Sequence, residues 1–139
     1  MKKFMPLFIA IFLITSAHIC HAKEPSQFTE EFFEMLMAGK ISEAYDQLFV
    51  GSQIPAQKPQ AVDVLKRQTS SVLPLYGSIV GLEKLREERI GQSIIRLVYV
   101  LKLEVAPTIW EFYFYKPDKN WFLANVIFND QFNLLHKVE

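Results

Sequence analysis

The spacing of hydrophobic residues changes once along this chain, near Gly77. Before that point apolar residues recur every three or four positions, as they do on one face of an amphipathic helix. Gly39 ends the first such stretch, and Pro59 suits the first turn of the last one because its missing amide has no partner there. We therefore expect helices at 26–38, 43–49 and 59–73, capped at the first start by Ser26 or Thr29, with a loop at 50–58 that carries Gly51 and Pro55.

After Gly77 the pattern alternates with a period of two, which indicates β-strands. It predicts strands at 79–90, 93–104, 107–115 and 121–128, with 116–120 as a hairpin loop and 129–139 as a tail that frays or adds a short helix. Residues 82–89 are so polar that both an edge strand and a helix fit them. Helices followed by an antiparallel meander predict an α+β fold, three helices on a curved sheet of about four strands.

The first 22 residues have the layout of a secretory signal peptide. Lys2 and Lys3 precede an apolar run at 4–14, and the small residues Cys20 and Ala22 occupy the −3 and −1 positions of a cut after Ala22. A cut after Ala17 is the second choice. Lipid attachment to Cys20 is the less favoured alternative, because it usually requires a small residue before the cysteine and Ile19 stands there. The run is too short for a membrane span, so we expect a periplasmic or secreted protein with no transmembrane segment after processing, and one domain at 23–139.

Removing this segment leaves 117 residues with a net charge of −2, no cysteine, and His136 as the one histidine. A domain of this size can form a core without disulfides. The lack of a basic block excludes a nucleic-acid binder. One histidine and no acidic cluster with calcium-loop spacing give no metal site. A Cys–His pair is impossible without a cysteine, His136 is the one histidine available to a serine, and the sequence has no Gly-x-Ser-x-Gly motif. We accordingly expect no cofactor, no metal and no nucleophilic catalysis.

The order of elements, the segment Gly39–Asp46 and the hairpin Tyr113–Leu123 together resemble the cystatin-like cone fold of the nuclear-transport-factor-two-like superfamily. The resemblance covers roughly residues 26–132 and is closest to small secreted bacterial domains of unassigned activity. It implies a cone-shaped sheet, and it is compatible with enzymes, lipid carriers and adaptors, so it does not choose among them. Steroid-isomerising relatives use an Asp base and a Tyr donor in an apolar pocket.

An isomerase-like or dehydratase-like enzyme is the alternative that this resemblance raises, with Asp46 or Glu111 as the base. Tyr45 and Asp46 are adjacent on a helix, so their side chains leave it about 100° apart and do not share a pocket. The wider set of candidate acids is Asp46, Glu104, Glu111 and Asp130, and the candidate donors are Tyr45, Tyr99, Tyr113 and Tyr115.

The aromatic residues give the clearest positive signal, and two interpretations of them stay open: a ligand pocket or the core of a disulfide-free domain. The sequence predicts a non-catalytic binding domain for an apolar small molecule, a lipid or a protein partner. Ile109, Tyr113 and Tyr115 share a sheet face through which a homodimer could form. The candidate pocket consists of Tyr45, Tyr99, Trp110, Phe112, Phe114 and Trp121.

Overall fold

The computed structural model describes residues 22–131, in which helices come first and strands follow. The helical half contains α1 (Pro25–Met37), α2 (Ile41–Leu48), α3 (Ile54–Gln57), α4 (Pro59–Val72) and the 3₁₀-helix η1 (Leu73–Tyr76). The strands are β1 (Ile79–Ile90), β2 (Ile94–Leu103), β3 (Thr108–Tyr115) and β4 (Phe122–Asn129). They form one antiparallel sheet in the order β1-β2-β3-β4, so β1 and β4 are its two edges.

The predicted α+β class is confirmed, two local expectations need correction, and one open alternative is decided. The 50–58 segment contains the short helix α3, because Pro55 sits in its first turn, where a proline is tolerated. Of the two conformations that the sequence leaves open for residues 82–89, the structure has the strand, since β1 pairs with β2 from Ile79 to Ile90. The chain does not leave helical geometry at Pro74, because η1 continues to Tyr76.

The start of α1 also differs from the expectation of a Ser26 or Thr29 cap. The helix begins at Pro25, and the Glu24 amide donates to the Gln27 side chain at 2.8 Å. Thr29 lies inside the helix and is fully buried. The signal segment, apart from Ala22, and the tail beyond Gln131 lie outside the described residues. Within 22–131, no helix has the length and apolarity that crossing a bilayer requires.

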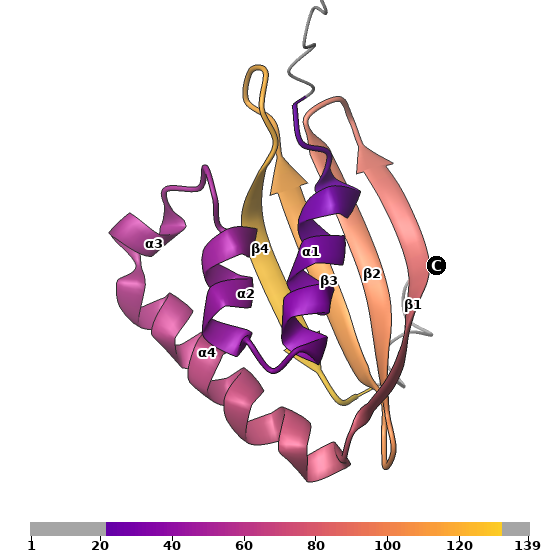
Figure 1. Cartoon of the computed structure of the whole chain (residues 1–139). Helices are drawn as coiled ribbons and strands as arrows, with labels where there is room; N and C mark the ends of the chain where they lie inside the picture. Colours follow the sequence, from indigo (N-terminus) through magenta and orange to yellow (C-terminus); the bar gives the residue numbers. More distant parts are fainter. Residues whose placement is uncertain (1–21, 132–139) are drawn as a thin grey trace, which may run out of the picture.

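One face of the sheet, here called the inner face, is covered by helices. In Figure 1, α1 crosses in front of β3, and α2 and α4 lie beside it on the β4 side. Phe32 and Phe33 of α1 are fully buried between the helices and the sheet. Their ring centroids lie 5.5 Å and 5.8 Å from that of Trp110, at distances typical of favourable aromatic pairs. The core therefore fills the space between helix α1 and the curved sheet.

Two buried hydrogen bonds tie helices into this apolar core. The hydroxyls of Tyr45 and Thr69 lie 2.7 Å apart and join α2 to α4, and those of Thr29 and Tyr99 lie 2.8 Å apart and join α1 to β2. Burial raises the pKa of Tyr45 to about 12, which keeps its phenol protonated at any physiological pH. Every buried side-chain polar atom of the described residues has a hydrogen-bond partner within the protein. The core of these residues therefore contains no polar group that needs a ligand to complete its hydrogen bonding.

Candidate functional site

The six aromatic residues that the sequence singles out lie together in the filled core. All are buried, with exposed fractions between 0% and 5%. Tyr99, Trp110 and Phe112 pack on Phe33 with centroid distances between 5.1 and 5.8 Å. Of the six, Phe114 also lines a surface pocket, described below. Their assignment as ligand contacts remains a prediction, and their surroundings are those of core side chains.

None of the four candidate acids belongs to the buried core cluster, and each has a polar partner of its own. Asp46 is two-thirds exposed and forms an ion pair with Lys66 at 2.6 Å. Glu104 is exposed and accepts a hydrogen bond from the Ser78 amide at 2.9 Å. Asp130 is exposed and accepts from the Tyr76 hydroxyl, which raises the pKa of that phenol.

Glu111, the fourth acid, belongs to a charged cluster on the sheet face opposite the helices, here called the outer face. Arg96 donates to one Glu111 oxygen from Nε at 3.0 Å and from Nη2 at 2.9 Å, and to Glu88 at 3.2 Å. Tyr113 donates to the same Glu111 oxygen at 3.1 Å, and burial together with this bond raises the pKa of its phenol. Because three donor groups from two residues hold Glu111, it is a fixed structural acceptor rather than a free base.

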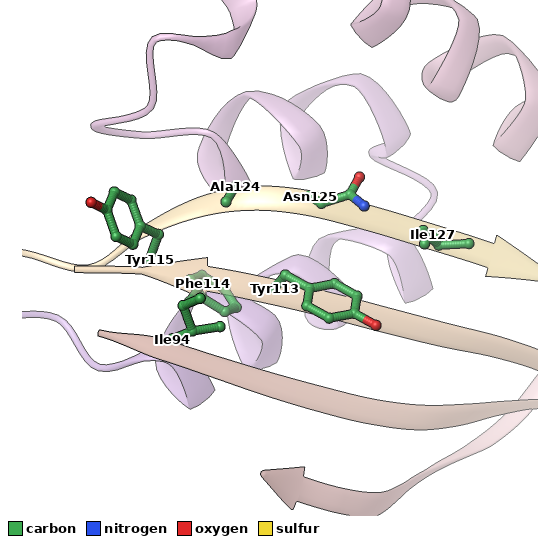
Figure 2. Close-up of a pocket in the computed structure, with 7 residues that line it drawn as sticks. All are labelled: Ile94, Tyr113, Phe114, Tyr115, Ala124, Asn125 and Ile127. Carbon is green, nitrogen blue, oxygen red and sulfur yellow. The ribbon is translucent and has the colours of Figure 1, made fainter. Parts of the chain in front are cut away.

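The outer face contains an apolar pocket of about 360 Å³ beside this cluster, here called the outer-face pocket. It lies over the end of the sheet where β2 begins, β3 ends and β4 begins. Figure 2 shows Ile94 and Tyr115 at one end of it and Ile127 toward the other. The lining residues are Ile94, Tyr113, Phe114, Tyr115, Ala124, Asn125 and Ile127.

A β-bulge opens this pocket. The pairing between β3 and β4 shifts between Tyr113 and Phe114, so Tyr113 pairs with Asn125 whereas Phe114 pairs with Leu123, leaving Ala124 as the extra residue. An extra residue bends its strand and breaks the side-chain alternation. The small Ala124 side chain, exposed at this point, leaves space that a larger residue would fill.

The chemistry of the outer-face pocket suits binding and offers little for catalysis. Its walls are mostly apolar, with the hydroxyls of Tyr113 and Tyr115 and the amide of Asn125 as polar groups. No carboxylate or imidazole is among the lining residues, so the pocket itself supplies no acid–base pair. No cluster of three or more potential metal ligands is present in the part of the chain that the structure describes.

Sequence reasoning missed this pocket because it treated the last strand as regular. Leu123 and Val126 are both buried although they are three positions apart, a spacing that strict alternation forbids. This break in the period is the signal that could have located the bulge. The expected exposed face of Ile109, Tyr113 and Tyr115 is also uneven: Ile109 is 3% exposed and Tyr115 is 39% exposed.

Comparison with known proteins gives one informative result. No protein family profile matches the sequence, and no curated protein is significantly similar to it. A crystal structure of a Campylobacter jejuni protein named as an NTF2-like transpeptidase superposes with a TM-score of 0.54, covering 73% of this chain and 97% of that one at 10% identity. At this identity the match shows shared architecture and says nothing of shared activity. The chain therefore has an NTF2-like α+β fold, as the resemblance in its sequence implies.

Proposed function

We propose that this protein is an exported, non-catalytic binding domain that takes an apolar small molecule or lipid chain into the outer-face pocket. The observation that carries the proposal is the pocket of about 360 Å³ with a mainly apolar lining, on a face that the helices leave uncovered. Ligand sites of this kind combine apolar walls with a few polar groups that fix orientation. The hydroxyls of Tyr113 and Tyr115 and the Asn125 amide fit that second role.

The placement of the acids supports binding over the isomerase-like alternative. Proton abstraction requires a base within hydrogen-bond reach of the substrate in an apolar pocket. Asp46 is engaged by Lys66 on the surface, and Glu111 is engaged by Arg96 and Tyr113. Neither lines the outer-face pocket, and neither lies among the buried aromatic residues of the core.

A fluorescence titration tests the proposal. The probe is 8-anilinonaphthalene-1-sulfonate, which brightens in apolar sites, and the variant is Ile127→Glu, at a side chain 42% exposed on the pocket wall. We expect saturable binding that weakens at least tenfold in Ile127→Glu. Val105→Glu, at a residue 73% exposed outside this pocket, is the matched control and should bind as the parent does. Equal binding by all three proteins would refute the proposal.

A homodimer through the outer face is a second candidate function, which the exposed apolar residues of that face favour. Ile90, Tyr115 and Ile127 are between 39% and 44% exposed. In the strand pairing, Ile94 lies opposite Ile90 on one side and opposite Tyr115 on the other, so Ile90 and Tyr115 belong to one row of residues across the sheet. Light scattering separates the two functions. A dimer that Ile127→Glu converts to monomer supports the second, and a strict monomer refutes it.

A further inference from the structure

A second surface, at the β4 edge of the sheet, has features of a peptide-binding groove. Two pockets of about 220 Å³ and 280 Å³ lie between α4 and β4. The first is lined by Ala61, Val62 and Leu65 of α4, by residues 124–126 of β4, and by Phe49, Ile54 and Lys58 from the segments before α4. The second is lined by Gln68 and Val72 of α4 with residues 128–130. Because both walls advance along the chain in the same direction, the pockets lie in line along one groove, here called the α4–β4 groove.

The α4 wall of this groove is a regular helical stripe. Four of its residues recur at intervals of four, three and four, which places them on one face of the helix. Two of them are half-buried and two are exposed, so the stripe is only partly covered by the rest of the domain. The stripe consists of Ala61, Leu65, Gln68 and Val72.

The β4 wall is a free strand edge. β4 is terminal in the sheet order, and within residues 22–131 its backbone makes no interstrand hydrogen bonds except to β3. The unpaired amides and carbonyls of such an edge form a template for another extended chain. Between residues 124 and 130 this edge runs for about 20 Å at the usual rise of roughly 3.3 Å per residue, a length that accommodates about six residues of extended peptide.

The two edges of the sheet are protected very differently. β1 carries six charged residues among twelve, a composition that discourages pairing with another strand. β4 carries none among its eight residues, and it has no proline. Among residues 22–131, its protection is limited to the bulge at Ala124 and to the neighbouring helix α4.

The position of α4 beside the β4 edge limits what kind of molecule the groove can bind. Because α4 and β4 bound the groove on two sides, it favours a single extended segment over the whole sheet of a second folded copy. A single extended segment is about one strand wide and presents side chains alternately to the two sides. Lys58 lines the groove at its first end, and its side chain has no ion-pair partner among the described residues.

We propose that the α4–β4 groove binds an extended peptide segment of another protein by adding it as a fifth strand beside β4. The segment has apolar residues at alternate positions, to contact Leu65 and Val72, and an acidic group at the end that meets Lys58. Recognition of this kind takes affinity from main-chain hydrogen bonds and specificity from pockets for alternate side chains. The groove shares Ala124 and Asn125 with the outer-face pocket, but the proposal requires no ligand in that pocket.

Peptide selection followed by binding measurements tests this proposal. A random heptapeptide phage library is panned on the protein, and enriched peptides are synthesised with fluorescein for anisotropy titration. Alternating apolar residues and an acidic end are expected in the enriched set. Ala61→Trp and Gln68→Trp, each at an exposed residue of the stripe, should weaken binding at least tenfold. Lys58→Glu should weaken it more at low than at high salt.

Ser70→Trp is the matched control, because this exposed position lies on the opposite side of α4 from Ala61. It should leave peptide affinity unchanged, and all variants should retain the parent's circular dichroism. The proposal is overturned if no peptide is enriched, or if the groove variants and Ser70→Trp bind alike. It is also overturned if light scattering shows a dimer of the parent protein that Ala61→Trp dissociates, since the groove would then hold a second copy.

Discussion

Replacing Trp110 by alanine measures whether the interior of the fold is a filled core or a ligand site. Trp110 is fully buried, and its ring stacks on Phe128 with a centroid distance of 4.6 Å. Its indole N–H donates to the Thr108 hydroxyl at 2.9 Å, and Thr108 is itself fully buried. The substitution therefore removes aromatic contacts from α1, β3 and β4 and leaves one buried hydroxyl without its donor.

The expected cost follows from these contacts. A buried tryptophan removes about 200 Å² from water, and at roughly 25 cal/mol per Å² this is worth about 5 kcal/mol as an upper limit. Measured tryptophan-to-alanine changes in cores fall at about 3–5 kcal/mol. We expect Trp110→Ala to lie at the upper end of that range because of the Thr108 hydroxyl. A domain of this size has a total stability of about 5–15 kcal/mol, so the variant is marginal or unfolded.

Urea denaturation followed by circular dichroism measures the change in the free energy of unfolding. Ile127→Ala, at a side chain 42% exposed on the outer face, serves as the comparison and should cost about 1 kcal/mol or less. If Trp110→Ala does not fold, Trp110→Phe provides a milder test with an expected loss of about 1–3 kcal/mol. A loss below about 1 kcal/mol for Trp110→Ala would refute the reasoning, because it would mean that the ring lines a cavity instead of filling a core.

Three further predictions concern protonation, the outer-face cluster and processing. The pKa of Tyr45 is about 12, against an ordinary value of 10, so its protonated phenol stabilises the fold fully below pH 10 and loses this contribution, up to about 3 kcal/mol, as the pH rises toward 12. A titration followed by phenolate absorbance should show a late step that disappears in Tyr45→Phe. An unchanged titration curve in that variant would contradict the prediction. Arg96→Ala leaves the partly buried Glu111 carboxylate with Tyr113 as its remaining donor and should cost about 1–3 kcal/mol in urea denaturation, with partial recovery in Arg96→Ala/Glu111→Gln. A loss near zero would show that the cluster adds no stability. N-terminal sequencing of the exported protein should begin at Lys23, and an intact Met1 would rule out cleavage.

The sequence predicts the architecture well because the architecture follows from periodicity. The helical spacing around Phe32 and the alternation around Tyr99 each require one buried face, and the fold buries those faces against each other. The conformation of β1 could not be predicted from the sequence because its side chains are almost all exposed and give no buried face. Its pairing with β2 makes it a strand. The helix α3 escaped notice because one turn of four residues is too short for a period to show.

The candidate sites were harder to predict, since they depend on what packing leaves unfilled. Aromatic residues in a sequence indicate buried apolar surface, and only packing decides whether Trp110 faces another side chain or a ligand. The outer-face pocket depends on a single extra residue in β4, and the α4–β4 groove depends on how far a helix stands from a strand edge. A single extra residue and the distance between a helix and a strand leave no periodic pattern in the sequence. Neither can therefore be predicted from the alternation of hydrophobic and polar positions.

The central claim is that ligand binding takes place on the outer face of the sheet while the aromatic interior is a closed core. Amide chemical-shift mapping of the ¹⁵N-labelled protein, titrated with 8-anilinonaphthalene-1-sulfonate, tests it directly. The account predicts saturable shifts at Ile94, Tyr115 and Ile127, around the outer-face pocket, and unchanged signals at Phe33 and Tyr99 in the core. Saturable shifts centred on Phe33 and Tyr99, with those of the outer face unmoved, would contradict it.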